Sequence, residues 1–248
     1  LLQNLLAQNP DVYSEGNSGL CTVMWDAKTS CEHNAAQQLI GVGKDVTFKN
    51  ALLKSMPSIY YPDIKGKIIL DKTRTWVNEA NICMARSYIS EDVKTIVMVR
   101  PLEEIVASLV KVSAQNSFDF PYEGLLSEGG DFLREVHATY FAAKSQDPSF
   151  LFVSYDDVVS RTDETLARIY NHIGKEPFAH NVHQVTQTVF EDDERNNMVG
   201  MHDIRPEIAK QANEVVLPDW VKAACENMTR AIFSEIDGIG RSKIGKAA

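Results

Sequence analysis

The stretch Thr95-Ile96-Val97-Met98-Val99-Arg100-Pro101-Leu102-Glu103-Glu104-Ile105 decides the fold, because it predicts a strand that runs directly into a helix. Residues 95–99 form a nearly continuous β-branched run, which is typical of a strand covered on both faces. Pro101 suits the first turn of a helix, where an N–H group would have no helical partner. After it, apolar side chains recur at the spacing of one helix face: Leu102, Ile105, Val106, Leu109 and Val110. Arg100 therefore stands where a strand meets a helix.

Two more strand-and-helix units flank this one. Residues 67–72 predict a strand followed by a helix over about 73–90, with Trp76, Ala80, Cys83, Met84 and Ser87 on one face. Residues 150–155 predict a strand, and a helix follows over about 162–172. A helix is also expected at about 131–146, and the tail after residue 175 is expected to be mostly helical. The alternation predicts a single α/β domain over residues 1–248, with a central parallel sheet and helices on both faces.

The composition of the chain indicates which partners are disfavoured and which cellular compartment is favoured. The 248 residues carry 34 Asp and Glu against 25 Lys and Arg, a formal net charge of −9. This excess of acid disfavours duplex nucleic acid and anionic membranes as partners. The four cysteines form no CxxC pair, which favours reduced thiols and a cytoplasmic protein. No apolar run reaches the roughly 18 residues that a membrane span needs.

The ends of the three predicted strands point to an anionic ligand. They fall at Lys72, Arg100 and Tyr155, and ligands of open parallel sheets bind outside the carboxyl ends of the strands. A guanidinium beside the first turn of a helix can hold an anion together with the free N–H groups. Two other roles for Arg100 remain open: an ion pair with Glu103 or Glu104, or a solvated side chain.

One motif at this position resembles that of a known family. Residues 95–100, with Ser108 eight positions after Arg100, resemble the 3′-phosphate motif of sulfotransferases, which use 3′-phosphoadenosine-5′-phosphosulfate (PAPS) as sulfonate donor. The resemblance implies that Arg100 and Ser108 hold the 3′-phosphate. The chain departs from the pattern in having Pro101-Leu102 where an Asp/Asn-Pro pair is usual, which changes the turn but keeps the spacing.

Other segments resemble the same family in the same order along residues 1–206. They are Leu1–Val12, Asp71–Arg74, Val153–Val159 with Thr165–Gly174, and His202–Pro206. The nearest pattern is that of tyrosylprotein- and carbohydrate-type members. The resemblance implies a P-loop NTPase-like sulfotransferase fold, a nucleotide contact from Tyr155, and closure over PAPS by Arg205.

The family's 5′-phosphosulfate loop has no counterpart in the sequence. In the family it lies immediately before the helix that starts here at Leu1. That helix begins in register, with no Met and no cap. We therefore expect a strand and a phosphate loop before Leu1 in the natural protein.

The resemblance also implies a reaction, the transfer of a sulfonate group from PAPS to a hydroxyl or amine with the bisphosphate PAP as product. Lys72 would neutralise charge on the leaving phosphate oxygen, unless it pairs with Asp71 or is solvated. Glu15 would be the base for the acceptor proton, unless it is a plain loop carboxylate; His202 is the second candidate. We expect no metal, and we interpret the acidic run 191–194 as a solvated loop.

Two other functions remain open from the sequence. A small-molecule kinase would need a Walker motif, which the sequence lacks, and magnesium. A non-catalytic module would bind nucleotide without turnover. The acceptor is expected to carry a hydroxyl and to be a small molecule, carbohydrate or peptide, with residues 13–60 and 116–148 shaping its pocket. The sequence does not indicate an oligomeric state.

Overall fold

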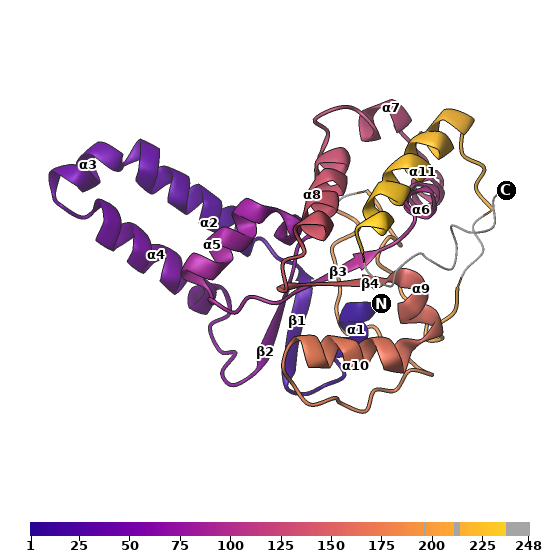
Figure 1. Cartoon of the computed structure of the whole chain (residues 1–248), viewed down its shortest axis with the longest axis horizontal. Helices are drawn as coiled ribbons and strands as arrows, with labels where there is room; N and C mark the ends of the chain where they lie inside the picture. Colours follow the sequence, from indigo (N-terminus) through magenta and orange to yellow (C-terminus); the bar gives the residue numbers. More distant parts are fainter. Residues whose placement is uncertain (196, 211–213, 237–248) are drawn as a thin grey trace. The chain divides into compact units, whose positions relative to one another are not determined.

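The computed structural model describes residues 1–195, 197–210 and 214–236. Its fold is mixed α/β, with two small parallel sheets of two strands each, β1–β2 and β3–β4 (Figure 1). The chain divides into two compact units, one of residues 10–93 and the other of residues 1–9 with the residues from 94 onward. The predicted α/β class with parallel strands is confirmed. One central sheet and one domain over residues 1–248 stay predictions.

The larger unit is built around the pair β3 (Thr95–Val99) and β4 (Phe150–Ser154), which run in parallel and in register along their whole length. In Figure 1, α6, α8 and α11 lie on one side of this pair and α9 and α10 on the other. The helices of this unit are α1 (Leu2–Leu6), α6 (Leu102–Gln115), α7 (Tyr122–Leu125), α8 (Asp131–Ser145), α9 (Tyr155–Ser160), α10 (Thr162–His172) and α11 (Asp219–Ser234).

In the larger unit, β3, α8, β4 and α10 occur within a residue or two of their expected bounds. Val97, Val99 and Val153 are buried, as expected for strands covered by helices. Helix α10 buries Ile169 and Tyr170 and ends in a Schellman motif at Gly174, whose φ is +65°. There the N–H groups of Gly174 and Lys175 bond to the carbonyls of Asn171 and Tyr170.

The expectation of a mostly helical tail after residue 175 was wrong. Within the described part of the tail, only α11 is an α-helix, and residues 175–210 run as irregular chain. Long-range hydrogen bonds replace helical ones there. The side-chain oxygen of Asn4 accepts the N–H groups of Thr188 and Val189 at 2.6 and 2.8 Å, and Val185 donates to the carbonyl of Pro206.

A buried hydrogen-bond chain connects α10 to this irregular segment. Asn9 donates to the hydroxyl of Tyr170 at 3.0 Å, and the same hydroxyl lies 3.0 Å from Nε2 of His180. Tyr170 is 1% exposed. Burial lowers the pKa of His180 below its ordinary value, although a backbone hydrogen bond with Leu5 and the charge of Asp163 oppose the shift.

We expect His180 to make the protein less stable in acid. Because the unfolded chain binds a proton at this residue that the folded protein resists, the free energy of unfolding falls as the pH drops from about 6.5 through the lower folded-state pKa. His180→Gln should flatten this loss, measured by urea unfolding between about pH 7 and 5. His183→Gln, at an exposed site, is the control; equal pH profiles for both variants would contradict the assignment.

The smaller unit pairs β1 (Val12–Asn17) with β2 (Ile68–Lys72) in parallel. The remaining elements are α2 (Leu20–Thr29), the π-helix η1 (Ser30–Asn34), α3 (Ala36–Gly41), α4 (Asp45–Tyr60), the 3-10 helix η2 (Arg74–Val77) and α5 (Glu79–Tyr88). Their core contains Leu20, Cys21, Met24, Leu53, Tyr61 and Met84. No pattern in the sequence predicted β1.

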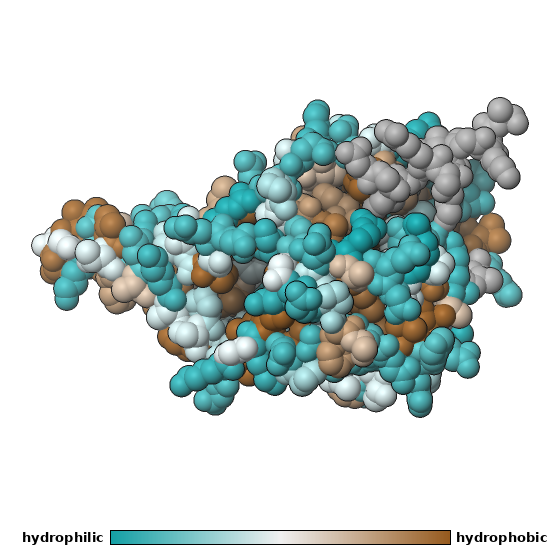
Figure 2. Space-filling view, turned by 60° about the horizontal axis from the view of Figure 1, so that its bottom comes forward, coloured by the Kyte–Doolittle hydropathy of each residue, from teal (hydrophilic) through white to brown (hydrophobic). Residues whose placement is uncertain are grey.

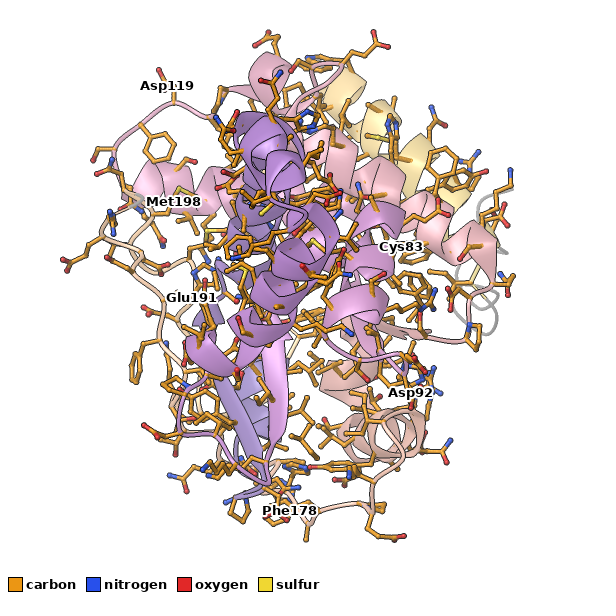
Figure 3. The ribbon with its side chains drawn as sticks, turned by 90° about the vertical axis from the view of Figure 1, so that its left-hand side faces the viewer. Cys83, Asp92, Asp119, Phe178, Glu191 and Met198 are labelled. Carbon is orange, nitrogen blue, oxygen red and sulfur yellow. The ribbon has the colours of Figure 1, made fainter. Side chains whose placement is uncertain are left out.

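The helix expected over 73–90 is broken into η2 and α5, so the five residues predicted to share one face do not lie on one continuous helix. Asn78 caps a new helix, α5, by accepting the N–H of Ala80 at 3.0 Å, so a periodicity counted from Trp76 does not carry through. The buried residues are Asn81, Ile82, Met84 and Ala85. Ala80, Cys83 and Ser87 are exposed; Figure 3 shows Cys83 on α5.

Apolar side chains gather at the end of the α2–α4 hairpin, the left-hand end of Figure 2. Ile40, Val42 and Val46 are 64%, 66% and 57% exposed there. Among the residues with described coordinates, no helix combines the length and apolar character needed to cross a bilayer.

Candidate functional site

Arg100 and Tyr155 meet at the carboxyl end of the β3–β4 pair. The last residues in register are Val99 and Ser154, so the next residue of each strand leaves the sheet at the same edge. The guanidinium carbon of Arg100 lies 4.5 Å from the ring centroid of Tyr155, in cation–π contact. Ser154 caps α9 by accepting the N–H of Asp157 at 3.0 Å, which fixes where Tyr155 begins the helix. The structure thus brings together two residues that the sequence singled out.

The same edge carries a second cation and two carboxylates. Nε of Arg100 donates to Oε2 of Glu104 at 2.8 Å. Nζ of Lys210 lies 3.5 Å from Oε1 of Glu104 and 2.8 Å from Oδ1 of Asp156. We call Arg100, Glu104, Tyr155, Asp156 and Lys210 the Arg100 cluster. The pairing with Glu104 is one of the roles that the sequence left open for Arg100.

Both cations of the Arg100 cluster contact the Glu104 carboxylate. Burial raises the pKa of Glu104, but the hydrogen bond from Arg100 and the charges of Lys210 and Arg100 outweigh burial and hold it below its ordinary value. The side chains of Arg100 and Glu104 are 23% and 28% exposed, so solvent still reaches them. A phosphate offers oxygens of the same kind with more charge, and it can compete with Glu104 for these donors.

Ser108 lies one helical turn beyond Glu104. The two residues are four apart on α6, so they share a helix face. Ser108 is half-buried. Glu104 and Ser108 therefore lie on the first two turns of α6, and Arg100 stands two residues before the helix begins.

Lys210 takes part in the Arg100 cluster, and the sequence analysis missed it. Arg205, the cation predicted for this late segment, is exposed, and none of the contacts described for the chain links it to the Arg100 cluster. Lys210 follows Arg205 by five residues in the same irregular segment. Its contacts with Glu104 and Asp156 join segments far apart in the sequence, so no local pattern reveals them. The only sequence signal for Lys210 is its position near Arg205, as a second cation in the same segment.

A second group of polar side chains lies at the end of β2 in the smaller unit. The carboxylate of Asp71 accepts three side-chain hydrogen bonds, from Ser18 Oγ at 2.6 Å, Tyr61 Oη at 2.7 Å and Trp76 Nε1 at 2.6 Å. Its neighbour Lys72 accepts the N–H of Ser18 through its carbonyl at 2.7 Å. These contacts fix the strand end that carries Lys72, and they use Trp76 as part of the scaffold.

Glu15 lies on β1, beside a bulge in the sheet, and not in a loop as the alternative interpretation had it. Ser14 is opposite Leu70 but Asn17 is opposite Lys72, so β1 has one extra residue between the two pairs. Bulges re-aim side chains and are common next to active sites. The hydroxyl of Tyr13 donates to Oε1 of Glu15, and Glu15 is exposed. A carboxylate can accept a proton from a bound hydroxyl, which is the role predicted for Glu15.

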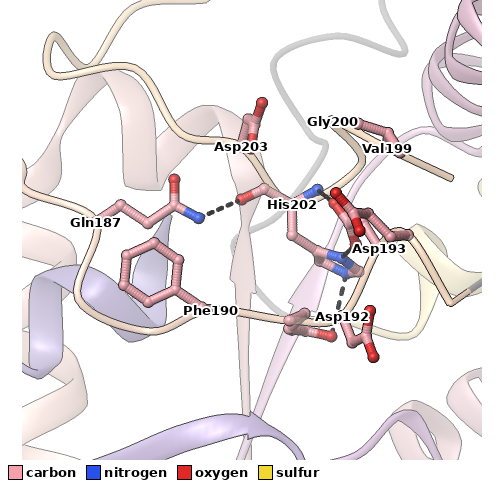
Figure 4. Close-up of a pocket in the computed structure, with 10 residues that line it drawn as sticks. Gln187, Phe190, Asp192, Asp193, Val199, Gly200, His202 and Asp203 are labelled. Atoms are coloured by element: carbon pink, nitrogen blue, oxygen red, sulfur yellow. Dashed lines mark hydrogen bonds and ion pairs between the residues drawn. The ribbon is translucent and has the colours of Figure 1, made fainter.

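His202 lies between two carboxylates in the irregular segment (Figure 4). Its Nδ1 is 2.5 Å from Oδ1 of Asp193, its Nε2 is 3.4 Å from Oε2 of Glu191, and its backbone N–H donates to Oδ2 of Asp193 at 2.9 Å. Burial raises the pKa of Asp193, but the hydrogen bonds from the His202 ring and backbone outweigh it, so that pKa is lowered. Engagement of both ring nitrogens favours a structural role for His202 over that of a base.

This histidine lines a hollow of about 290 Å³. The lining residues are Gln187, Phe190, Glu191, Asp192, Asp193, Glu194, Val199, Gly200, His202 and Asp203. Two carboxylates of the run 191–194, those of Glu191 and Asp193, therefore lie against the His202 ring, whereas we had expected the whole run to be solvated. Across the described ranges of the chain, no group of three or more His, Cys, Asp or Glu residues is placed to hold a metal ion.

Comparisons with known proteins do not assign the chain to a family. No family model, no curated protein and no solved structure matches the chain. The function therefore has to be argued from the side chains themselves.

Proposed function

We propose that the protein is a PAPS-dependent sulfotransferase. The observation that carries the proposal is the Arg100 cluster, in which a guanidinium stacked on Tyr155 and an ammonium converge at the start of α6. Strand ends beside helix N-termini are where parallel α/β proteins hold phosphate groups. The 3′-phosphate of PAPS is the group that the motif implied for this position.

The proposal includes the fold as well. We infer a P-loop NTPase-like sulfotransferase fold in which the parallel strands belong to one sheet with helices on both faces, in a single domain over residues 1–248. The support is the strand-and-helix order, together with parallel pairing in both two-stranded sheets.

Each candidate residue has one task in the proposed nucleotide site. Arg100 and Ser108 bind the 3′-phosphate, Tyr155 contacts the nucleotide, and Arg205 closes over it. Lys210 adds a cation to the same anion site, in exchange for its contact with Glu104. PAPS is a co-substrate and PAP its product, so the proposal needs no metal.

The transfer step is an in-line displacement on sulfur. The acceptor oxygen bonds to sulfur while the bond from sulfur to the bridging phosphate oxygen breaks, and PAP leaves with that electron pair. Glu15 takes the acceptor's proton, and Lys72 offsets the charge that develops on the leaving oxygen. His202 is the second candidate for the base, behind Glu15 because carboxylates face both of its ring nitrogens.

The acceptor is a hydroxyl or amine on a small molecule, carbohydrate or peptide. Residues 13–60 and 116–148 shape its pocket within this proposal, since loops and helices that differ on a common scaffold set specificity. The surplus of acidic residues supports neither nucleic acid nor membrane as partner, and the cysteine pattern supports a cytoplasmic protein.

We expect PAP to bind at least about 10-fold more tightly than 5′-AMP, which lacks the 3′-phosphate, because charge-assisted hydrogen bonds to Arg100 contribute roughly 1.5–3 kcal/mol. Calorimetric titration without magnesium measures both affinities. Labelled PAPS with a panel of phenol, N-acetylglucosamine, a tyrosine-containing peptide and benzylamine tests turnover. Equal affinities for PAP and 5′-AMP would overturn the proposal, and a need for magnesium and ATP would favour a kinase.

A further inference from the structure

The bulged end of β1 carries a tyrosine–carboxylate pair, and we propose that Tyr13 is the positioning residue that holds Glu15 for proton transfer. This role rests on the proposed sulfotransferase function. Neither the 3′-phosphate motif nor the sulfonate transfer gives Tyr13 a role, so this assignment is additional to both.

The first observation is the direction of the two side chains. Tyr13 and Glu15 are two residues apart on β1, so they point to the same face of the strand. The Tyr13 hydroxyl donates directly to Oε1 of Glu15. The extra residue of the bulge lies between Ser14 and Asn17, and it re-aims the strand at the point where Glu15 must meet its substrate.

The second observation is that the ring of Tyr13 is itself held in place. It packs edge-on against the ring of Tyr61, with centroids 6.0 Å apart and planes at 77°. Tyr61 is 6% exposed and donates to Asp71 at 2.7 Å. A continuous series of contacts therefore runs from the partly buried carboxylate of Asp71, which accepts three hydrogen bonds, to the exposed Glu15.

The two hydroxyls remain donors at neutral pH. The hydrogen bond to Glu15 raises the pKa of Tyr13, and burial, followed by the hydrogen bond to Asp71, raises the pKa of Tyr61. Tyr13 therefore keeps its proton while Glu15 accepts the proton of the acceptor hydroxyl. A fixed carboxylate oxygen reduces the rotational freedom that Glu15 would otherwise lose in the transition state.

The test compares Tyr13→Phe with Tyr88→Phe. Tyr88, like Tyr13, packs against the core of the smaller unit, and it lies outside the residues proposed to shape the acceptor pocket. Labelled PAPS and the four-acceptor panel give kcat and KM, and calorimetry gives PAP affinity. We expect Tyr13→Phe to lower kcat about 10-fold with KM and PAP affinity within about twofold, and Tyr88→Phe to match the wild type.

A second readout follows the pair without relying on turnover. Each protein and its Tyr13→Phe counterpart are titrated by ultraviolet absorbance. The difference between the two curves gives the pH at which Tyr13 ionises. Glu15→Gln should move that ionisation to lower pH, because the hydrogen bond that raises the pKa of Tyr13 weakens.

The outcomes separate this role from the proposed function. A wild type that neither binds PAP nor transfers sulfonate to any of the four acceptors overturns the function, and the role with it. An active wild type with equal losses in Tyr13→Phe and Tyr88→Phe, or with a fully active Tyr13→Phe, overturns the role alone. Tyr13 ionising at the same pH with and without the Glu15 carboxylate also overturns it.

Discussion

Arg100→Ala should weaken PAP binding by roughly 10- to 100-fold, because the guanidinium makes charged hydrogen bonds worth about 1.5–3 kcal/mol to a bound phosphate. Arg100 follows the last residue of β3, and its guanidinium lies against the ring of Tyr155. Its side chain therefore loses little conformational entropy when an anion binds. Calorimetric titration with PAP at low salt measures the change. Added salt should reduce the difference between wild type and variant, since screening weakens exposed charge pairs.

Three variants decide whether this loss reports phosphate binding. Arg100→Lys keeps the charge but loses the planar fork, so its affinity should fall between wild type and Arg100→Ala. Arg161→Ala removes a comparable i,i+4 ion pair, with Asp157, and should leave PAP affinity unchanged. Glu104→Gln removes the carboxylate that occupies Arg100 and Lys210, and should tighten PAP binding. Wild-type affinity in Arg100→Ala, or weaker binding in Glu104→Gln, would mean that Arg100 serves the ion pair alone.

The sequence predicted those parts of the fold whose pattern is local. The junction at Arg100 was predicted because a β-branched run, a proline and an apolar helix stripe follow one another without interruption. Glu104 is four positions after Arg100, so their ion pair was foreseeable from spacing alone. Helix α10 was predicted with its bounds because its apolar stripe ends at Gly174, which has the positive φ that a helix stop needs.

The parts that were missed depend on distant contacts. Val185 and Val189 are both buried and four residues apart, a spacing typical of a helix. Their N–H groups instead bond to Pro206 and to the Asn4 side chain, which no local pattern reveals. Lys210 reaches the Arg100 cluster by the same kind of long-range contact.

The strand β1 was missed for a different reason. Its residues after Ser14 are Glu15, Gly16 and Asn17, which have low strand propensity, and they are kept in the strand by pairing with β2 across a bulge. No strand was therefore predicted at Glu15, and a plain loop carboxylate was the alternative to its role as the base. Conflicts between local propensity and observed structure tend to mark functional sites, and this one coincides with Glu15.

Glu15→Gln should leave PAP affinity within about twofold of the wild type while sulfonate transfer falls about 100-fold or more, the range typical of lost general-base catalysis. The amide keeps the size and the hydrogen-bond acceptor for Tyr13, but it cannot take up the acceptor proton. The measurements are calorimetry with PAP and initial rates with labelled PAPS. A fall in PAP affinity equal to the fall in rate would place Glu15 in nucleotide binding instead.

Two further variants determine which residue is the base. Glu91→Gln neutralises another exposed carboxylate of the same unit and should retain wild-type rates, so it controls for the change in net charge. His202→Gln breaks the contacts with Asp193 and Glu191, and if His202 is structural it should lower stability more than rate. If Glu15→Gln is fully active and His202→Gln is inactive with unchanged PAP affinity, the proton goes to the histidine. In that case the tyrosine beside Glu15 has no carboxylate base to position.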